Sequence, residues 1–282
     1  MRTPYLAEFR HQLSELNNRL SHYIFVWEQF AIDNSTIISE HKKLQTTKAY
    51  PTNKFAPQYD VKLEKLEVSH SETSIFILKS LFILLYTEFE VYIRSLYELA
   101  RKADDSLPNL GVRERVPDKI FENLGILQAF EKKEVWTFDY FRLRRNRIMH
   151  SGGQSKGDLA DIIKNKGYAL QKYWQNRLTS GLFGLNFQSE ETSHFIKEEI
   201  FDFINIWRIL TTKIDGLICE YITDVKITHF LYIEFINEPS CNLKKWGKKR
   251  SKSKFIGYAN MKFGLKLSEE DLSPFSFTGD VA

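Results

Sequence analysis

Apolar residues recur every three or four positions along most of the chain, which is the spacing of one face of an α-helix. The clearest case is 74–101, where the apolar stripe is unbroken and predicts a long central helix. Its members are Ile75, Leu78, Phe82, Leu85, Phe89, Tyr92, Leu96 and Leu99. The same spacing predicts a helix over 5–30 and another over 193–222, which we expect to pack on the central helix.

Shorter helices are predicted between these long ones. Pro117 opens a helix over 117–130, because proline is tolerated in a first helical turn. An arginine-rich helix over 134–150 follows, and two glycines at 152 and 153 mark its end. The stretch 158–178 is also expected to be helical, whereas two prolines and no periodicity over 46–60 predict a loop. The body of the protein is therefore predicted to be an all-α bundle.

The C-terminal part has a different pattern. The stretches "VKITHFLYIEFI" and "KFIGYANMKFGLKL" mix β-branched and aromatic residues in short runs, which favours a small β-hairpin or an irregular cap. We divide the chain into an N-terminal helix and loop at 1–69, a helical domain at 70–222 and a basic appendage at 223–282. The acidic end of that appendage is expected to be flexible.

Composition favours a soluble protein of a reducing compartment. The chain has 282 residues, 43% of them hydrophobic, and can build a sizeable core. Its first residues show no apolar stretch followed by a small-residue cleavage site, so we expect no secretory signal. The longest apolar stretch is interrupted by Lys79, Glu88 and Glu90, which favours a buried helix over a membrane span. Cys219 and Cys241 form no metal-ligand spacing and no disulfide framework. We expect a cytoplasmic location.

The net charge of +4 is concentrated in one segment. Nine basic residues and no acid lie between 244 and 266, and the final residues are acidic. In "LKKWGKKRSKSKF", basic residues could neutralise phosphates and aromatic rings, Trp246 and Phe255, could stack on unpaired bases. A charged tail that only aids solubility is the alternative. The candidate RNA-binding residues are Lys244, Lys245, Trp246, Lys248, Lys249 and Arg250.

The segment "RLRRNRIMHSGG", residues 142–153, holds four arginines within six residues. An α-helix turns by 100° per residue, which places four apolar residues on one face: Phe138, Phe141, Ile148 and Met149. Arg145 lies in the middle of this face, and Arg142 and Arg144 flank it. An unpaired buried charge costs several kcal/mol. Arg145 is therefore expected to lie in a cleft, beside a carboxylate or at a subunit seam.

Asn146 and His150 are one turn apart on this helix, so the amide can orient the imidazole. The helix dipole favours the protonated imidazole, while nearby arginines disfavour it. Such opposing effects can leave a histidine titrating near neutrality, as acid–base catalysis requires. Cationic residues are also common in the last turn of ordinary helices, so the residues alone leave both interpretations open.

"RNRIMH", residues 145–150, resembles the signature of the HEPN superfamily (higher eukaryotes and prokaryotes nucleotide-binding domain). In that family an arginine, usually followed by a polar residue, precedes a histidine near the end of a helix in an all-α bundle. Arg145, Asn146 and His150 occupy these places, and Arg144 also fits the allowed spacing. The helix containing "TEFEVYIRSLYEL" and the later long helix resemble the family's architecture over about 70–222.

The resemblance implies a metal-independent endoribonuclease toxin of abortive infection, antiphage defence or a toxin–antitoxin system. It also implies a homodimer in which two copies of Arg145, Asn146 and His150 form one composite cleft, and a possible antitoxin or defence-system partner. The ribose 2′-hydroxyl would attack the phosphorus and leave 2′,3′-cyclic phosphate and 5′-hydroxyl ends. His150 suits the proton transfers and Arg145 the phosphate. The sequence offers no convincing metal-ligand constellation, and no cofactor is expected.

Two alternatives remain open from the sequence. A HEPN-like module could bind RNA, a nucleotide or a protein without cutting, or the chain could be a purely structural helical adaptor. One further residue, Glu88, interrupts a second apolar row on the central helix. It could pair with Arg145 or another motif arginine as a structural ion pair, or contribute to the cleft.

Overall fold

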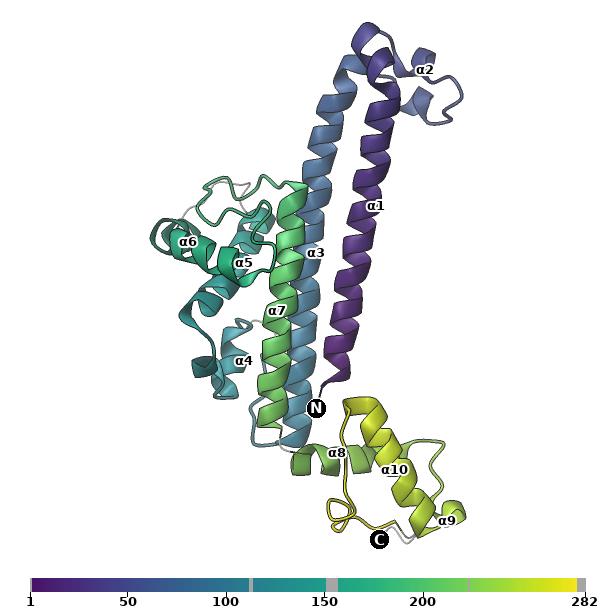
Figure 1. Ribbon diagram of the computed structural model, residues 1–282, viewed down its shortest axis with the longest axis vertical. Coiled ribbons are helices and arrows are strands. Elements are labelled where there is room, and N and C mark those ends of the chain that lie inside the picture. The colour runs from purple at the N-terminus through teal and green to yellow at the C-terminus, as the bar shows by residue number, and fades with distance from the viewer. Residues whose placement is uncertain (1, 112–113, 151–156, 223, 278–282) are drawn as a thin grey trace. The chain divides into compact units, whose positions relative to one another are not determined.

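A computed structural model of the chain describes residues 2–111, 114–150, 157–222 and 224–277, without the side chains of residues 150, 224 and 225 (Figure 1). Over this part of the chain the protein is built from α-helices and a few short 3-10 turns, without a β-strand. Within the described residues, β-type pairing is limited to an isolated bridge between Gln45 and Lys62. The predicted all-α fold is confirmed.

Three long helices dominate the fold: α1 (Pro4–Glu40), α3 (Leu66–Ala103) and α7 (Lys197–Tyr221). Helix α1 extends ten residues beyond its predicted end. The remaining helices are α2 (Thr46–Ala49), α4 (Asp118–Asn123), α5 (Lys132–His150), α6 (Asp158–Arg177), α8 (Asp224–Asn237), α9 (Leu243–Trp246) and α10 (Lys248–Phe263). Single 3-10 turns lie at η1 (Ala56–Gln58), η2 (Leu63–Lys65) and η3 (Leu127–Ala129). The predicted loop 46–60 thus contains two short helical turns.

The chain divides into two compact units, each made of separate segments. One comprises 1–11, 87–138 and 207–282, and the other comprises 12–86 and 139–206. Helices α1, α3, α5 and α7 contribute residues to both units.

The first unit has an aromatic core between α3, α5 and α7. The ring of Phe89 stacks on Trp207 with centroids 4.0 Å apart, and lies 5.9 Å from the ring of Phe138. The buried hydroxyl of Tyr92 donates to the carbonyl of Thr211 at 3.0 Å. The apolar stripe that predicts the central helix therefore supplies the core, and the polar end of its tyrosine is satisfied.

The C-terminal part of this unit is helical, so the prediction of a β-hairpin or irregular cap is wrong for its described residues. Large apolar residues recur every four positions and are buried, as in Ile227, Leu231 and Phe235 on α8. Phe255 and Phe263 on α10 are also buried. Burial of these helical faces outweighs the local strand preference of the residue types.

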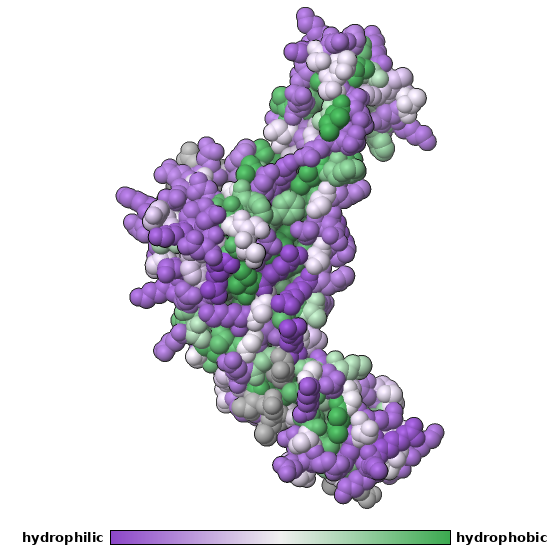
Figure 2. Space-filling view, in the orientation of Figure 1, coloured by the Kyte–Doolittle hydropathy of each residue, from purple (hydrophilic) through white to green (hydrophobic). Residues whose placement is uncertain are grey.

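In the second unit, α1 and α3 pair beside the start of α7. Phe82 packs with Phe203 at 4.7 Å between ring centroids, and Leu20 and Leu78 are buried. Between 21 and 40 no side chain of α1 is fully buried, and none of α3 is before Leu78. Figure 2 shows apolar residues on the surface over this outer part of α1 and α3, at the top of the view. None of the helices in the described ranges has a stretch long and apolar enough for a membrane crossing.

Candidate active site on helix α5

Helix α5 is held by aromatic side chains of its own chain. Phe141 is fully buried in the second unit, and its ring meets Phe203 edge-on at 4.9 Å between centroids. In the first unit, Phe138 lies 5.5 Å from Phe121. These two α5 rings belong to the intramolecular core, so they are not free to form the expected subunit seam. Met149 has 50% of its surface exposed and remains available for contact with a second subunit.

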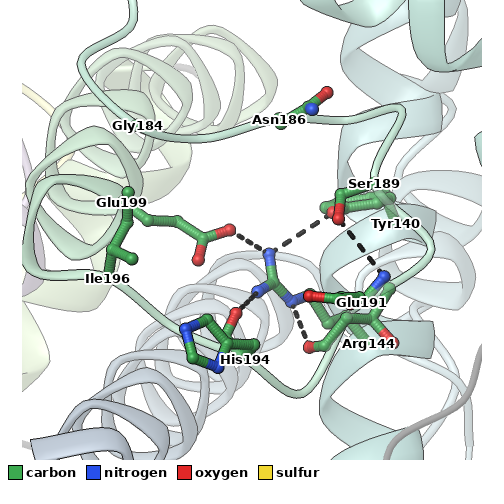
Figure 3. A pocket seen from close by; sticks show the side chains of 10 residues that line it. Tyr140, Arg144, Gly184, Asn186, Ser189, Glu191, His194, Ile196 and Glu199 are labelled. Atoms are coloured by element: carbon green, nitrogen blue, oxygen red, sulfur yellow. Dashed lines mark hydrogen bonds and ion pairs between the residues drawn. The ribbon is translucent and has the colours of Figure 1, made fainter. Parts of the chain in front are cut away.

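Arg144 is the buried arginine of α5, with only 2% of its surface exposed. Its Nε donates to the carbonyl of Thr192 at 2.8 Å, and its Nη2 donates to the carbonyl of His194 at 3.5 Å. Its Nη1 forms an ion pair with the carboxylate of Glu199 and donates to the hydroxyl of Tyr140 at 3.3 Å (Figure 3). The guanidinium therefore ties α5 to the start of α7 and to the segment before it.

The surroundings keep Arg144 charged. Burial lowers the pKa of its guanidinium, but the interactions with Tyr140 and with the Glu199 carboxylate outweigh burial and raise the pKa above its ordinary value. Burial raises the pKa of the Tyr140 hydroxyl, which stays neutral and can accept this hydrogen bond. The ring of Phe195 covers the guanidinium with its centroid 4.1 Å from Cζ. Arg144 is thus a desolvated structural cation with its donors engaged.

This position corrects the helical-wheel prediction, which placed Arg145 at the centre of the apolar face and Arg144 at its edge. Met149 is half exposed while Tyr140, omitted from that face, is 1% exposed. Exchanging one for the other moves the centre of the face toward Arg144. The carboxylate that the buried arginine requires is Glu199. Glu88 is half-buried and belongs to the other unit, so its pairing with Arg145 stays a prediction.

Arg145 and Asn146 lie together on the half-exposed side of α5. Arg145 Nη1 donates to Asn146 Oδ1 at 3.2 Å. The Nε atoms of Arg145 and Arg147 are shielded from solvent and make no hydrogen bond with the described residues. Arg142 instead pairs with Asp139 at 3.0 Å. The last turns of α5 therefore present a guanidinium and an amide whose hydrogen-bonding capacity is only partly used.

His150 is the last residue of α5, and its side chain lies outside the described part of the structure. The two glycines expected to end the helix, Gly152 and Gly153, lie there as well. The predicted contact between His150 and Asn146 therefore stays a prediction. The backbone position of His150, one turn after Asn146 on a continuous helix, is the one that the predicted pairing requires.

A cavity of about 140 Å³ adjoins Arg144 (Figure 3). Asn186, Ser189 and Glu191 line its outer wall, and Ser189 Oγ accepts from the backbone N–H of Glu191 at 3.2 Å. Ligand pockets usually measure about 300–1,000 Å³. The cavity is therefore too small for a nucleotide, and the guanidinium at its base is already engaged. We do not assign substrate binding to it.

Asp202, absent from the candidates in the sequence, organises the loop opposite Arg144. Its fully buried carboxylate accepts from the backbone N–H groups of Phe183, Gly184 and Leu185 at 2.8–3.0 Å. A Cβ atom at Gly184 would lie 2.8 Å from the Cβ of Glu198, so the loop passes closer to α7 than other residues allow. A lone acid inside the apolar run "IFDFINIW" is the signal that points to such a role.

We expect Asp202→Ala to lower the free energy of unfolding by about 3 kcal/mol, because three backbone donors lose a charged, buried acceptor. Asp202→Asn should lose less, since its amide oxygen still accepts. Urea unfolding followed by circular dichroism measures both effects. Glu190→Ala, at an exposed position of the same loop, should stay within about 0.5 kcal/mol of wild type. Equal stability of the Asp202→Ala and Glu190→Ala proteins would contradict this role.

The basic segment of the first unit forms α9 and the first turn of α10. Its five cations are exposed: Lys244, Lys245, Lys248, Lys249 and Arg250. Trp246 is half-buried, with Lys254 Nζ 4.4 Å from its ring centroid. Phe255 is fully buried and cannot stack on a base, contrary to the role considered for it. The segment is thus a helical cationic surface with one accessible ring.

Among the described residues, no group of three or more His, Cys, Asp and Glu side chains is placed to hold a metal ion. No protein-family model, no curated protein and no solved structure matches the chain, so the likeness to the HEPN superfamily is the resemblance of residues 145–150 and their helical setting.

Proposed function

We propose that the protein is a HEPN-type endoribonuclease whose catalytic residues are Arg145, Asn146 and His150. The observation that carries the proposal is the contrast between two adjacent arginines. Arg144 is buried against Glu199, whereas Arg145 is half-exposed beside Asn146. Of the two arginines that fit the motif, Arg145 is therefore the one able to reach a substrate phosphate.

The proposed reaction assigns each side chain a chemical task. The ribose 2′-oxygen attacks the adjacent phosphorus, the bond from phosphorus to the 5′-oxygen breaks, and a 2′,3′-cyclic phosphate and a 5′-hydroxyl remain. His150 accepts the 2′-hydroxyl proton or donates one to the leaving oxygen. Arg145 offers its fork of donors to the charge that builds on the phosphorane. Asn146 orients Arg145 and, in this proposal, His150.

Arg144 is a positioning residue in this proposal. Through Thr192, His194 and Glu199 it fixes α5 one residue before the catalytic arginine. Catalytic groups lose rate when they are held loosely, and a desolvated ion pair with full hydrogen bonding is a rigid support. The proposal also includes a composite site formed by two chains. Met149, on the exposed side of the last turn, would contact the second chain. Light scattering of the purified protein tests whether it is a dimer.

The cationic surface of α9 and α10 is proposed to hold the RNA strand. We expect the triple variant Lys248→Ala, Lys249→Ala and Arg250→Ala to weaken RNA binding and to reduce the slope of log affinity against log salt by about 2, because each single-strand phosphate contact contributes about 0.7. Fluorescence anisotropy with labelled RNA at several salt concentrations measures the slope.

The matched control for that surface replaces three exposed lysines elsewhere, Lys43, Lys54 and Lys65, with alanine. This control has the same net charge as the first triple variant. A slope that falls equally in both would mean that overall charge, rather than the α9–α10 surface, contacts the RNA.

Incubation of the purified protein with mixed cellular RNA in the presence of a chelator tests the enzyme proposal. Fragments that accumulate with protein concentration support metal-independent cleavage. RNA that is bound but left intact would favour the second candidate, a HEPN-like module that binds RNA without cutting.

A further inference from the structure

The outer part of the α1–α3 pair carries a groove that the described residues leave open. Two cavities of about 310 Å³ and 480 Å³ lie along it, and Trp27 lines both. On α1, five of the lining residues follow one helical face at intervals of three or four positions. They are Ile24, Trp27, Ala31, Ser35 and Ile38.

Helix α3 provides the opposite wall with the same periodicity. This spacing is kept by Glu67, Ser71, Ser74 and Leu78, and Leu66, His70 and Ile75 also line the cavities. The wall is already ordered, since Ser74 Oγ hydrogen-bonds to the hydroxyl of Tyr23 and to Nε2 of His70, each at 2.9 Å. The ring of His70 stacks on that of Trp27. A preformed wall of this kind binds a partner without a large ordering cost.

Helix α7 closes one end of the groove. Lys197 and Glu198, its first two residues, line the inner cavity, and Lys197 pairs with Glu28 of α1. From there on α7 packs against α3 through Phe203 and Phe82. Beyond the N-terminal end of α7, helices α1 and α3 continue as a pair without it (Figure 1). The groove therefore lies where a third helix would continue the packing that α7 begins.

The pair by itself leaves its apolar residues incompletely buried. Ile24, Trp27, Ile38 and Ile75 are all half-exposed, although they point into the groove that the cavities define. A helix with one apolar face is stable when that face is buried against another element. The groove thus has the shape and surface that accept an amphipathic helix, with anchor side chains at intervals of three and four.

We propose that this groove binds an amphipathic α-helix of a partner protein, with basic residues on both sides of its apolar stripe. At 1.5 Å per residue, the α1 wall from 24 to 38 is roughly 21 Å long and matches about four helical turns. Of the charged residues that line the cavities, four are acidic and two are basic, which leaves a net negative charge although Glu28 pairs with Lys197 and Glu64 with Lys62. These are Glu28, Glu64, Glu67, Glu198, Lys42 and Lys197. A second copy of the chain would bring the same net negative charge against itself, which disfavours it as the occupant. The proposal does not depend on RNA cleavage.

The test uses the full chain and a labelled synthetic helix of about 15 residues with a leucine stripe flanked by lysines. We expect saturable binding by fluorescence anisotropy, and no comparable binding of a scrambled peptide of the same composition. Ser35→Lys and Ser71→Lys place a long cation in the groove at exposed positions, so each should weaken binding at least about tenfold, or 1.4 kcal/mol. Both variants leave the apolar residues of the pair unchanged, which keeps the fold intact.

The controls are Thr36→Lys and Thr73→Lys, at exposed positions on the opposite faces of the same helices, and they should bind the peptide as the wild type does. Equal binding of the scrambled peptide, or equal affinity in all four variants, would overturn the proposal. The proposal would also be overturned if light scattering showed that the wild-type protein is a dimer and that Ser35→Lys alone dissociates it. A second copy of the chain would then occupy the groove.

Discussion

Replacing Arg144 with alanine is expected to lower the free energy of unfolding by about 3–5 kcal/mol, because the carboxylate of Glu199 is left buried without its partner. The carbonyls of Thr192 and His194 lose a donor at the same time. Equilibrium unfolding in urea, followed by circular dichroism, gives the value. The loss is large against the total stability of an ordinary domain, about 5–15 kcal/mol, so purification at low temperature is advisable.

Arg142→Ala is the matched control for this measurement. It removes an arginine from the same helix, and that arginine pairs with Asp139 within one turn. Such local pairs contribute about 1 kcal/mol or less. The double variant Arg144→Ala with Glu199→Ala should be less destabilised than the sum of its single variants, because the two groups interact. Additive losses, or a stable Arg144→Ala protein, would show that the ion pair does not anchor α5.

Replacing Arg145 with alanine is expected to reduce RNA cleavage by about 10³-fold while the unfolding transition stays close to that of wild type. The rate loss follows from removing a cation that stabilises the phosphorane. The unchanged fold follows from its half-exposed position and its local contact with Asn146. His150→Ala should cost a similar factor, and Asn146→Ala less. Cleavage rates and urea unfolding curves of the same preparations measure both quantities.

Arg145→Lys is the control that separates charge from geometry. Lysine keeps the positive charge but lacks the planar fork of donors, so partial activity is expected. Full activity of a folded Arg145→Ala protein would contradict the assignment of the catalytic arginine. If, in addition, folded Arg144→Ala protein were inactive under conditions where it is stable, Arg144 would be the candidate instead.

The long helices could be predicted from the sequence because their apolar residues keep one face over many turns. Helices α8 and α10 differ from the predicted hairpin or cap, since the aromatic and β-branched residues of these stretches favour strands, whereas burial of one face of each helix decides for the helix. In the same way, local spacing finds the motif on α5 but not which arginine is buried. That choice depends on Glu199, which is 55 positions away in the chain.

The role of Asp202 likewise depends on residues that are distant in the sequence. Its three backbone partners lie 17–19 positions earlier, in a loop without any periodic pattern. A sequence can mark an acid within an apolar run as unusual, but the geometry of the loop that it binds appears only in the fold. The outer groove of α1 and α3 is a further example, because the pattern predicts an apolar face without showing whether α7 covers it.

The central claim is that α5 carries an RNA-cleaving site, and the chemistry of the fragment ends tests it most directly. Purified wild-type and His150→Ala proteins are incubated with one defined RNA in chelator, and the fragment ends are identified by enzymatic end-labelling and mass spectrometry. The proposal predicts 2′,3′-cyclic phosphate and 5′-hydroxyl ends at discrete positions with wild-type protein and intact RNA with His150→Ala. Intact RNA with both proteins, or identical fragments from both, would contradict it.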